Sequence, residues 1–410
     1  MRNDELVKFK QILILGYGVE GKASYDYLKK IHPEAKVAYA DEKDDLDYLK
    51  KQYEFDLVIK TPGIQKNLVK TKYTTATNIF FANFKGKIIG VTGTKGKSTT
   101  VTLIYRILKA SGFDAFPAGN IGLPALAYLM TSKKKEQICV YELSSYQLDD
   151  INFSPHIGVL TSLFPDHMNY HSSFEDYVNA KMNITRYQTE DDFFIYNPKI
   201  TSIDKYLPQI KSQKIPFSKK IPVSSDDLKI KGDHNIDNIR ASLTATRLFG
   251  VKNDKVSRVI MDFEGLPHRM QNLGRFSNIT FIDDAAATTP QSTIYAIKTI
   301  CNVNTIFLGG QDRGYRFDDL CHIIDQSSIE NIVLYKDTGE KIKQLLSKLS
   351  KRKFNYLTAN DLKQGVSWAY KITKPNTTCL LSMASPSYSI WKNFNQKGDQ
   401  FKYYVLKYAP

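Results

Sequence analysis

Short runs of apolar residues recur along the chain, and most of them end in glycine or in polar residues. Continuous apolar runs of this kind are typical of strands that are buried on both faces. They lie at residues 11–15, 36–40, 55–59, 87–89, 137–142, 156–161, 279–282, 305–308 and 378–381. Helical patterns follow two of them, one ending near Lys30 and one covering 101–109. Strands that alternate with helices predict an α/β fold with mostly parallel sheets.

Residues 90–100 read GVTGTKGKSTT and join the run at 87–89 to the helical pattern at 101–109. A glycine-rich turn before a helix points backbone N–H groups and the positive end of the helix at one place, which suits a triphosphate. Lys97 adds a mobile cation, and the hydroxyls of Ser98 and Thr99 stand where Mg²⁺ would bind. The usual P-loop pattern is incomplete, because Val91 occupies the place of its first glycine. The segment predicts a site for a nucleoside triphosphate.

A second glycine pattern follows the run at 11–15. Gly16, Gly18 and Gly21 form G-x-G-x-x-G between a strand and a helix, and Asp41 ends the next strand about twenty residues on. The run at 55–59 leads into the turn Thr61-Pro62-Gly63. Taken alone, this fingerprint allows a nicotinamide-dependent oxidoreductase, an alternative that leaves the P-loop unexplained.

The motifs divide the chain into three segments. At 410 residues the chain is long enough for about two to four domains. We predict a Rossmann-like domain at 1–85, a central P-loop mononucleotide-binding domain with a parallel sheet at 86–266, and a Rossmann-like domain at 267–410.

Composition narrows the class of protein. The chain is 42% hydrophobic and 24% charged, as is usual for soluble globular proteins. Its apolar runs fall short of the roughly 18 residues of a membrane span, and its N-terminus is polar, so we expect neither membrane insertion nor a signal peptide. The four cysteines lack CxxC spacing, which predicts neither zinc nor a disulfide framework. A cytoplasmic protein is expected.

The net charge of +15 comes from lysines dispersed among acidic residues. No basic-aromatic recognition motif accompanies them, so nucleic acid is not an expected partner. Dispersed surface lysines suit anionic small-molecule substrates equally well.

Four further positions are candidates for chemistry. Glu142 ends a strand predicted beside the P-loop strand, where a carboxylate could bind Mg²⁺. Asp166-His167 follows another strand, and Lys181 has the pattern of a surface helix lysine. Residues 232–238 read GDHNIDN, a predicted helix start capped by Asp233 that places Asn235 and Asn238 on one face.

In this order the motifs resemble those of the Mur ligase family, the ATP-dependent amide-forming enzymes of peptidoglycan precursor synthesis. The resemblance covers nearly the whole chain. It rests on GVTGTKGKSTT, GNIG at 119–122, ELSSYQL at 142–148, DHMNYH at 166–171, AK at 180–181, GDHNIDN, GLPHR at 265–269, DDAAATTP at 283–290, GGQDRG at 309–314, SPSY at 385–388 and KNF at 392–394.

The resemblance implies a ligase that adds D-glutamate to UDP-N-acetylmuramoyl-L-alanine through an acyl phosphate, with ATP and Mg²⁺. We expect a monomer. ELSSYQL, GLPHR and KNF favour D-glutamate addition over other Mur-type or folylpolyglutamate-type reactions. The alternatives that stay open are L-glutamate or another amino acid as acceptor and a catalytically inactive nucleotide-binding regulator.

The resemblance also implies a role for particular residues. Those implied to bind ATP are Gly93, Thr94, Lys95, Gly96, Lys97, Ser98, Thr99, Asn235, Asn238, Arg269 and Asp284. Those implied to hold Mg²⁺ are Ser98, Thr99, Glu142, His167 and a carbamylated Lys181, and the catalytic set is Lys97, Glu142, His167 and Lys181. Those implied to bind the UDP substrate are Gly16, Gly18, Val19, Glu20, Gly21, Asp41, Thr61, Pro62, Gly63, Asn120, Ser144, Ser145 and Gln147. Those implied to bind glutamate are Thr288, Arg313, Ser387, Tyr388 and Phe394.

The chain departs from the family pattern at two places, and a third residue, Glu20, carries a charge that does not suit its implied site. The family commonly has Asp-Ser-Lys where this chain has Asp284-Ala285-Ala286, and Arg313 stands where a lysine is also found. Arginine binds a carboxylate through a two-pronged fork that lysine cannot reproduce. Glu20 would repel a diphosphate placed beside it, so we expect its side chain to point away.

Overall fold

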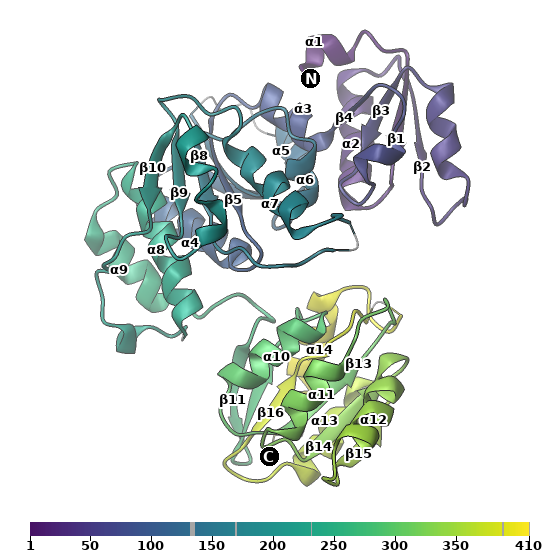
Figure 1. Ribbon diagram of the computed structural model, residues 1–410, viewed down its shortest axis with the longest axis vertical. Helices are drawn as coiled ribbons and strands as arrows, with labels where there is room; N and C mark the ends of the chain where they lie inside the picture. The colour runs from purple at the N-terminus through teal and green to yellow at the C-terminus, as the bar shows by residue number, and fades with distance from the viewer. Residues whose placement is uncertain (132–135, 169, 231, 388, 410) are drawn as a thin grey trace. The chain divides into compact units, whose positions relative to one another are not determined.

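The computed structural model describes residues 1–131, 136–168, 170–230, 232–387 and 389–409. The chain forms two compact units, Met1–Phe263 and Glu264–Pro410. The first unit contains two β-sheets and the second contains one (Figure 1). The predicted α/β class with mostly parallel sheets is confirmed.

The first sheet consists of parallel strands in the order β2-β1-β3-β4. Its strands are β1 Gln11–Leu15, β2 Lys36–Ala40, β3 Leu57–Lys60 and β4 Tyr73–Thr75. Helix α2, Val19–Ile31, covers one face through Tyr27 and Leu28. Leu15 pairs with Ala40 and with Lys60, so these three strands end at one edge.

The second sheet has the strand order β10-β9-β8-β5-β7-β6, with every pair parallel. Its strands are β5 Lys87–Thr92, β6 Ala115–Gly119, β7 Ile138–Glu142, β8 Ile157–Leu160, β9 Phe193–Tyr196 and β10 Gln213–Pro216. Helices α4 Lys97–Ala110, α8 Asp233–Arg247 and α9 Asn253–Asp262 pack together on one face. Helices α5 Ala125–Thr131, α6 Ser145–Asp149 and α7 Phe174–Met182 lie on the other face. Helices therefore cover both faces of this sheet.

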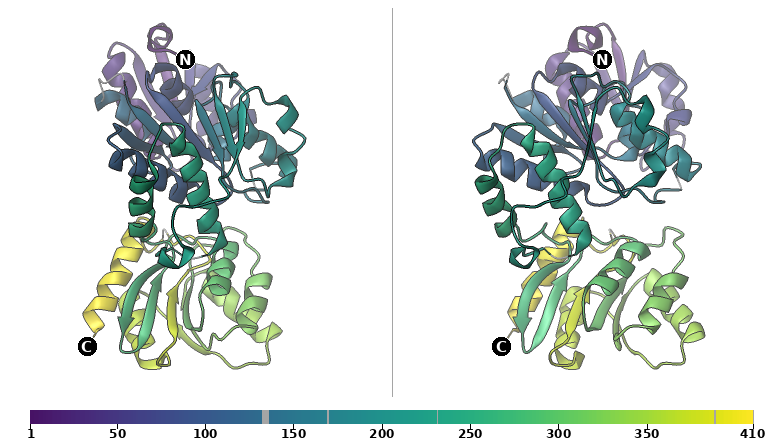
Figure 2. Two further views of the ribbon diagram at one scale, coloured as in Figure 1. Left: turned by 90° about the vertical axis from the view of Figure 1, so that its left-hand side faces the viewer. Right: turned by 60° about the vertical axis from the view of Figure 1, so that its left-hand side comes forward.

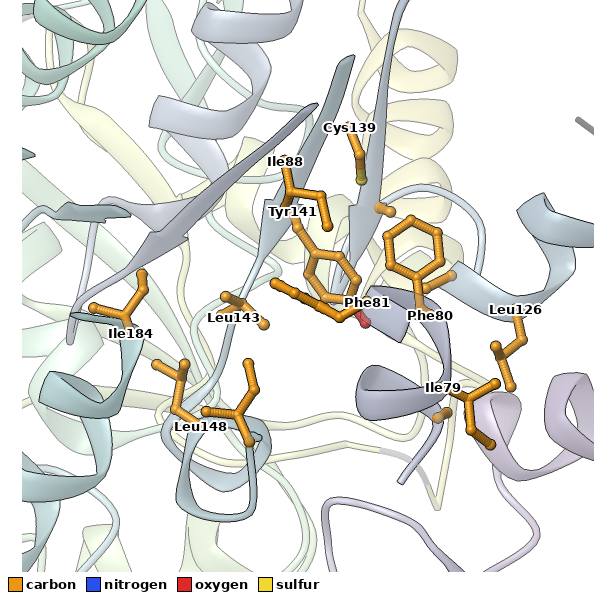
Figure 3. Packing of buried hydrophobic residues seen from close by; sticks show 14 of the residues in the cluster. Ile79, Phe80, Phe81, Ile88, Leu126, Cys139, Tyr141, Leu143, Leu148 and Ile184 are labelled. Carbon is orange, nitrogen blue, oxygen red and sulfur yellow. The ribbon is translucent and has the colours of Figure 1, made fainter. Parts of the chain in front are cut away.

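Helix α3, Ala76–Asn83, joins the cores of the first two sheets. Its Phe80 and Phe81 rings pack against Tyr141 of β7, with centroids 5.5 and 5.8 Å apart (Figure 3). The same cluster continues to Ile12 of β1 and Leu148 of α6. This shared core explains why the first two sheets form one compact unit.

The third sheet has the order β11-β12-β16-β13-β14-β15, and its edge strand β11 is antiparallel to β12. Its strands are β11 Gln271–Phe276, β12 Ile279–Asp283, β13 Val303–Gly309, β14 Asn331–Tyr335, β15 Asn355–Thr358 and β16 Thr378–Leu381. Helices α10 Pro290–Thr299, α11 Asp318–Asp325 and α12 Thr338–Leu349 cover one face. Helices α13 Leu362–Ile372 and α14 Phe394–Tyr408 cover the other (Figure 2).

Some local predictions differ from the structure. The helix after the glycine loop begins at Lys97 rather than 101, since the loop closes directly into its first turn. Asp233 does not cap α8: Gly232, at φ 94°, occupies the cap position, and its cap makes no side-chain hydrogen bond. The remaining short elements are α1 Asn3–Leu6, η1 Tyr48–Glu54, η2 Lys66–Leu68, η3 Asn183–Thr185, η4 Thr201–Ile203, η5 Leu207–Gln209 and η6 Ser225–Asp227. Across the described ranges, no helix is both long and apolar enough to cross a membrane.

Candidate active site

The glycine loop between β5 and α4 is shaped by two glycines with positive φ. Gly93 has φ 146° and Gly96 has φ 87°. A Cβ on Gly93 would lie 2.0 Å from Thr161 Oγ1, and one on Gly96 would lie 2.2 Å from Asn238 Oδ1. Both conformation and space therefore require glycine, and the loop wraps closely around the start of the helix.

Residues from β8 onward hold this loop in place. The Thr94 amide donates to the backbone oxygen of Ser162 at 2.8 Å, and the Lys95 amide donates to Ser162 Oγ at 2.9 Å. Thr94 Oγ1 accepts a hydrogen bond from the Tyr177 hydroxyl at 3.0 Å. These two amides are thus already engaged, and the first-turn amides of α4 are the backbone donors that stay directed outward.

The Lys97 side chain folds back over the loop that precedes it. Its Nζ donates to the backbone oxygens of Gly93 at 2.9 Å and Thr94 at 3.1 Å. A lysine held by carbonyl groups can turn to phosphate oxygens when an anion arrives, so this position suits an anion-binding cation.

Several of the predicted residues lie where the adjacent strands β8, β5 and β7 end. We call this group the nucleotide edge; it consists of Gly93, Lys97, Glu142, His167 and Lys181. Glu142 ends β7, is buried, and its Oε2 has no hydrogen-bond partner among the described residues. His167, at φ 59°, follows β8; burial lowers its pKa, although Asp166 acts in the opposite direction.

Lys181 is buried and lies against the glycine loop. It is 1% exposed, and its Nζ donates to Gly93 O at 2.9 Å and lies 4.6 Å from the Tyr177 ring centroid. Burial, followed by the charge of Lys97, lowers the pKa of Lys181 well below its usual value. Its helical pattern alone is typical of a surface lysine, but α7 turns this side chain inward.

Helix α8 brings its two asparagines to the glycine loop. Asn238 is buried and its Oδ1 accepts a hydrogen bond from Thr100 Oγ1 at 3.4 Å, while its Nδ2 donates to Asn235 Oδ1 at 3.4 Å. The two residues share a helix face, as their spacing predicted.

The first sheet places its predicted residues at the shared edge of β2, β1 and β3. The Tyr17 amide donates to Asp41 Oδ2 at 2.6 Å, and Thr61 Oγ1 donates to Leu15 O at 2.9 Å. A Cβ on Gly16 would lie 2.1 Å from Thr61 Oγ1, whereas Gly18 has open space around it. The hydrogen bond from the Tyr17 amide lowers the pKa of Asp41, so this carboxylate is held ionised.

Glu20 turns toward the second sheet. Gln147 Nε2 donates to Glu20 Oε2 at 3.3 Å, and the Ser144 amide donates to Gln147 Oε1 at 2.9 Å. The Oε1 atom of Glu20 is buried with no partner among the described residues, and burial raises the pKa of Glu20 to about 7.

The residues implied to bind the UDP substrate extend from the first sheet to α6 within one unit. Val19 begins α2, whereas Pro62, Gly63 and Asn120 lie in the turns that follow β3 and β6. Ser145 Oγ contacts His171 Nε2 at 3.0 Å.

In the second unit, the predicted residues follow the neighbouring strands β12, β16 and β13, whose ends we call the amino-acid edge. Thr288 follows β12, Ser387 follows β16 and Arg313 follows β13. The last two loops adjoin, because the Gln311 amide donates to Pro386 O at 2.6 Å. Phe394 begins α14, and its ring centroid is 6.5 Å from that of His268. Tyr388 lies outside the described residues.

Asp284 is more enclosed than a ligand to ribose would need to be. It is buried, accepts hydrogen bonds from the Met270 amide at 3.2 Å and from Ser382 Oγ at 2.9 Å, and burial raises its pKa to about 7. Arg269, in contrast, is exposed.

Several supporting residues were not expected from sequence. Ser162 and Tyr177 hold the glycine loop, and His268 forms a buried 2.7 Å pair with Asp283. Lys397 is buried in α14. No sequence motif includes Ser162 or Tyr177. The His268–Asp283 pair does have sequence signals, namely the histidine in GLPHR and the apolar run that ends at Asp283.

The sequence of this chain matches a known protein family and several named relatives. The model of the Mur ligase middle domain matches residues 91–247. The UDP-N-acetylmuramoylalanine--D-glutamate ligase of Oenococcus oeni is 31% identical over 430 residues, covering 96% of each chain. The protein of that name from Streptococcus pyogenes serotype M49 is 33% identical over 376 residues, covering 85% of this chain and 82% of its own. The chain belongs to the Mur ligase family.

Solved structures of Mur ligases share the fold. The MurF ligase of Thermotoga maritima in complex with ADP aligns over 97% of this chain and 95% of its own, with a TM-score of 0.62 and 16% identity. The UDP-N-acetylmuramate-alanine ligase MurC of the same organism aligns over 97% and 99%, with a TM-score of 0.61 and 18% identity. At these identities the likeness supports the Mur ligase fold, including its three sheets.

Proposed function

We propose that this Mur ligase joins D-glutamate to UDP-N-acetylmuramoyl-L-alanine at the expense of ATP, in the cytoplasmic stage of peptidoglycan precursor synthesis. The observation that carries the proposal is the nucleotide edge, where Lys97, Glu142 and Lys181 meet the glycine loop. The D-glutamate ligases that match most of the chain supply the substrate assignment.

In the proposed reaction, a carboxylate oxygen of UDP-N-acetylmuramoyl-L-alanine attacks the γ-phosphorus of ATP, and the bond from that phosphorus to the bridging oxygen of ADP breaks. The glutamate amine then attacks the acyl carbon of the acyl phosphate. The carbon–oxygen bond to phosphate breaks and the amine loses a proton. Phosphoryl transfer of this kind needs positioning and charge neutralisation more than covalent help from the protein.

The protein's own groups suit those needs. Lys97 and the first-turn amides of α4 would neutralise the phosphates, and Asn235 and Asn238 would hold the adenosine side. The edge of β2, β1 and β3 would receive the UDP part, since the space beside Gly18 is open. Glu20 contacts Gln147 instead of facing that glycine turn, which removes the repulsion expected from sequence.

The nucleotide edge also offers ligands for Mg²⁺. Glu142 has a buried oxygen without a hydrogen-bond partner among the described residues, and oxygen is the donor that Mg²⁺ prefers. Ser98, Thr99, His167 and a carbamate of Lys181 would complete the set, with phosphate oxygens as further ligands; carbamylation would turn the buried lysine into an anion. When bound, Mg²⁺ would offset the negative charge that develops on the phosphates.

The amino-acid edge would receive glutamate. Arg313 could bind one carboxylate through two parallel hydrogen bonds, and Thr288 and Ser387 could serve the other. Ala285 and Ala286 supply neither the hydroxyl nor the charge that the family pattern implies there.

The direct test is ADP release by the purified protein with ATP, UDP-N-acetylmuramoyl-L-alanine and either enantiomer of glutamate, omitting one substrate at a time. We expect release to require the nucleotide sugar and D-glutamate together. Preference for L-glutamate would overturn the named acceptor and leave the ligase chemistry standing. Release that is independent of both substrates would overturn the proposed function.

A further inference from the structure

Lys397 is a buried lysine to which the reaction above gives no role. It lies in the first turn of α14 and is 1% exposed. Its Nζ donates to Ser387 Oγ at 2.7 Å and lies 5.8 Å from the Trp391 ring centroid. The charges of Asp283 and Asp284 act on this lysine, but among the described residues no carboxylate oxygen lies within ion-pair distance of its Nζ. A buried cation without a bound anion is costly, so its retention calls for an explanation.

The contact with Lys397 determines how Ser387 can act. A hydroxyl has one proton to donate and lone pairs that accept. The Lys397 ammonium occupies a lone pair of Ser387 Oγ. Within the described ranges the proton of this hydroxyl has no acceptor, since the other bonds of Ser387 use its backbone oxygen. Among the described residues, the hydroxyl is therefore left with its proton to donate to a ligand.

The loop that carries Ser387 lies beside the loop that carries Arg313. Besides the bond from the Gln311 amide, a Cβ on Gly310 would lie 2.2 Å from Pro386 O, so the two backbones are in close contact. The Ser387 hydroxyl and the Arg313 guanidinium thus come from adjoining loops at the amino-acid edge. Two separated donors are what a ligand with two carboxylates requires.

We propose that Lys397 is a positioning residue for the acidic amino acid, holding the Ser387 hydroxyl as a donor to one carboxylate and adding its positive charge beneath that contact. The inference rests on the proposed function, because it takes glutamate as the acceptor. Lys397 would supply the positive charge that the family pattern implies at position 286, where this chain has alanine. The charge would then come from α14, which contacts the loop after β16, and not from the segment after β12.

The test compares Lys397→Met and Ser387→Ala, singly and combined, with the wild type. Lys402→Met is the matched control, because it removes an exposed lysine from the same helix. Each single variant should raise the KM for D-glutamate about tenfold, the scale of one charge-assisted hydrogen bond, with the KM values for ATP and for the nucleotide sugar unchanged. The combined variant should add little to Ser387→Ala alone, since Lys397 acts through that hydroxyl.

An unchanged KM for D-glutamate, an equal rise in all three KM values, or additive effects in the combined variant would overturn the inference. If Lys397→Met fails to fold, Ser387→Ala decides the matter, because an unchanged KM for D-glutamate in that variant contradicts the proposed contact. Failure of the proposed function itself gives a different result, namely a wild-type protein without glutamate-dependent ADP release.

Discussion

The nucleotide edge and the amino-acid edge each contain a buried lysine, but the two lysines are held differently. Lys181 donates to a backbone oxygen of the glycine loop, whereas Lys397 donates to a side-chain hydroxyl. The first contact follows from loop geometry that two glycines impose. The second depends on the meeting of α14 with a loop from β16. Lys181 thus bonds to an oxygen that every residue type carries, whereas the contact of Lys397 requires a hydroxyl at position 387.

The largest effect is expected for Lys97→Ala at the nucleotide edge. Loss of this cation should lower kcat by about 10²–10³, as removal of one preorganised donor to a developing charge commonly does. Binding of the nucleotide sugar should be nearly unchanged, because its proposed groove lies mainly at the edge of the first sheet. Steady-state kinetics and calorimetric titration measure the two quantities, and Lys109→Ala on the exposed side of α4 is the control. Loss of both catalysis and nucleotide-sugar binding in a folded Lys97→Ala variant would contradict the assignment of the two binding sites to different sheets.

Lys181→Ala should lower activity by about 10²-fold, the upper range for groups that organise a metal site. A short carboxylic acid added to this variant should restore part of the activity, because it replaces the carbamate oxygens. The measurement is ADP release with and without acetate, and density beyond Nζ in a crystal of the wild type would show the carbamate directly. Full activity of Lys181→Ala without an additive would refute the role.

At the amino-acid edge, Arg313→Lys should weaken glutamate binding by about 1–3 kcal/mol, since lysine loses the two-pronged contact. Affinity for ATP should change little. Titration of each ligand into the variant measures both effects, and Arg316→Lys, on an exposed arginine three residues away, is the matched control. An equal loss for both ligands would show that the substitution disturbs the fold instead.

The smallest effect concerns pH and the His268–Asp283 pair. The hydrogen bond to Asp283 raises the pKa of His268 in the folded protein. The stabilisation is therefore complete below about pH 6.5, the ordinary value for histidine, and is lost as the pH rises through the raised folded value. Wild type should exceed His268→Gln in stability by about 1 kcal/mol at pH 6 and by less at pH 9. Thermal unfolding of both proteins across this range gives the difference; a gap that widens toward pH 9 would contradict the sign.

The same contrast explains what could be predicted from the sequence. The glycine loop, the fingerprint at Gly16 and the strand ends that carry Asp41 and Glu142 are contiguous patterns, and their three sheets could be predicted with them. The inward direction of Lys181 and the capping by Gly232 could not, because each depends on packing between elements. Lys397 was missed for the same reason: a lysine in a helical pattern has the same sequence signature whether it faces solvent or a buried hydroxyl.

The most direct test of the account is to follow oxygen from the substrate carboxylate. UDP-N-acetylmuramoyl-L-alanine labelled with ¹⁸O in its alanyl carboxylate would be converted with ATP and D-glutamate, and the released phosphate analysed by mass spectrometry. One ¹⁸O atom is expected in each phosphate, because the attacking carboxylate oxygen leaves with the phosphoryl group. Phosphate without label, formed alongside the amide product, would contradict activation of the carboxylate at the nucleotide edge.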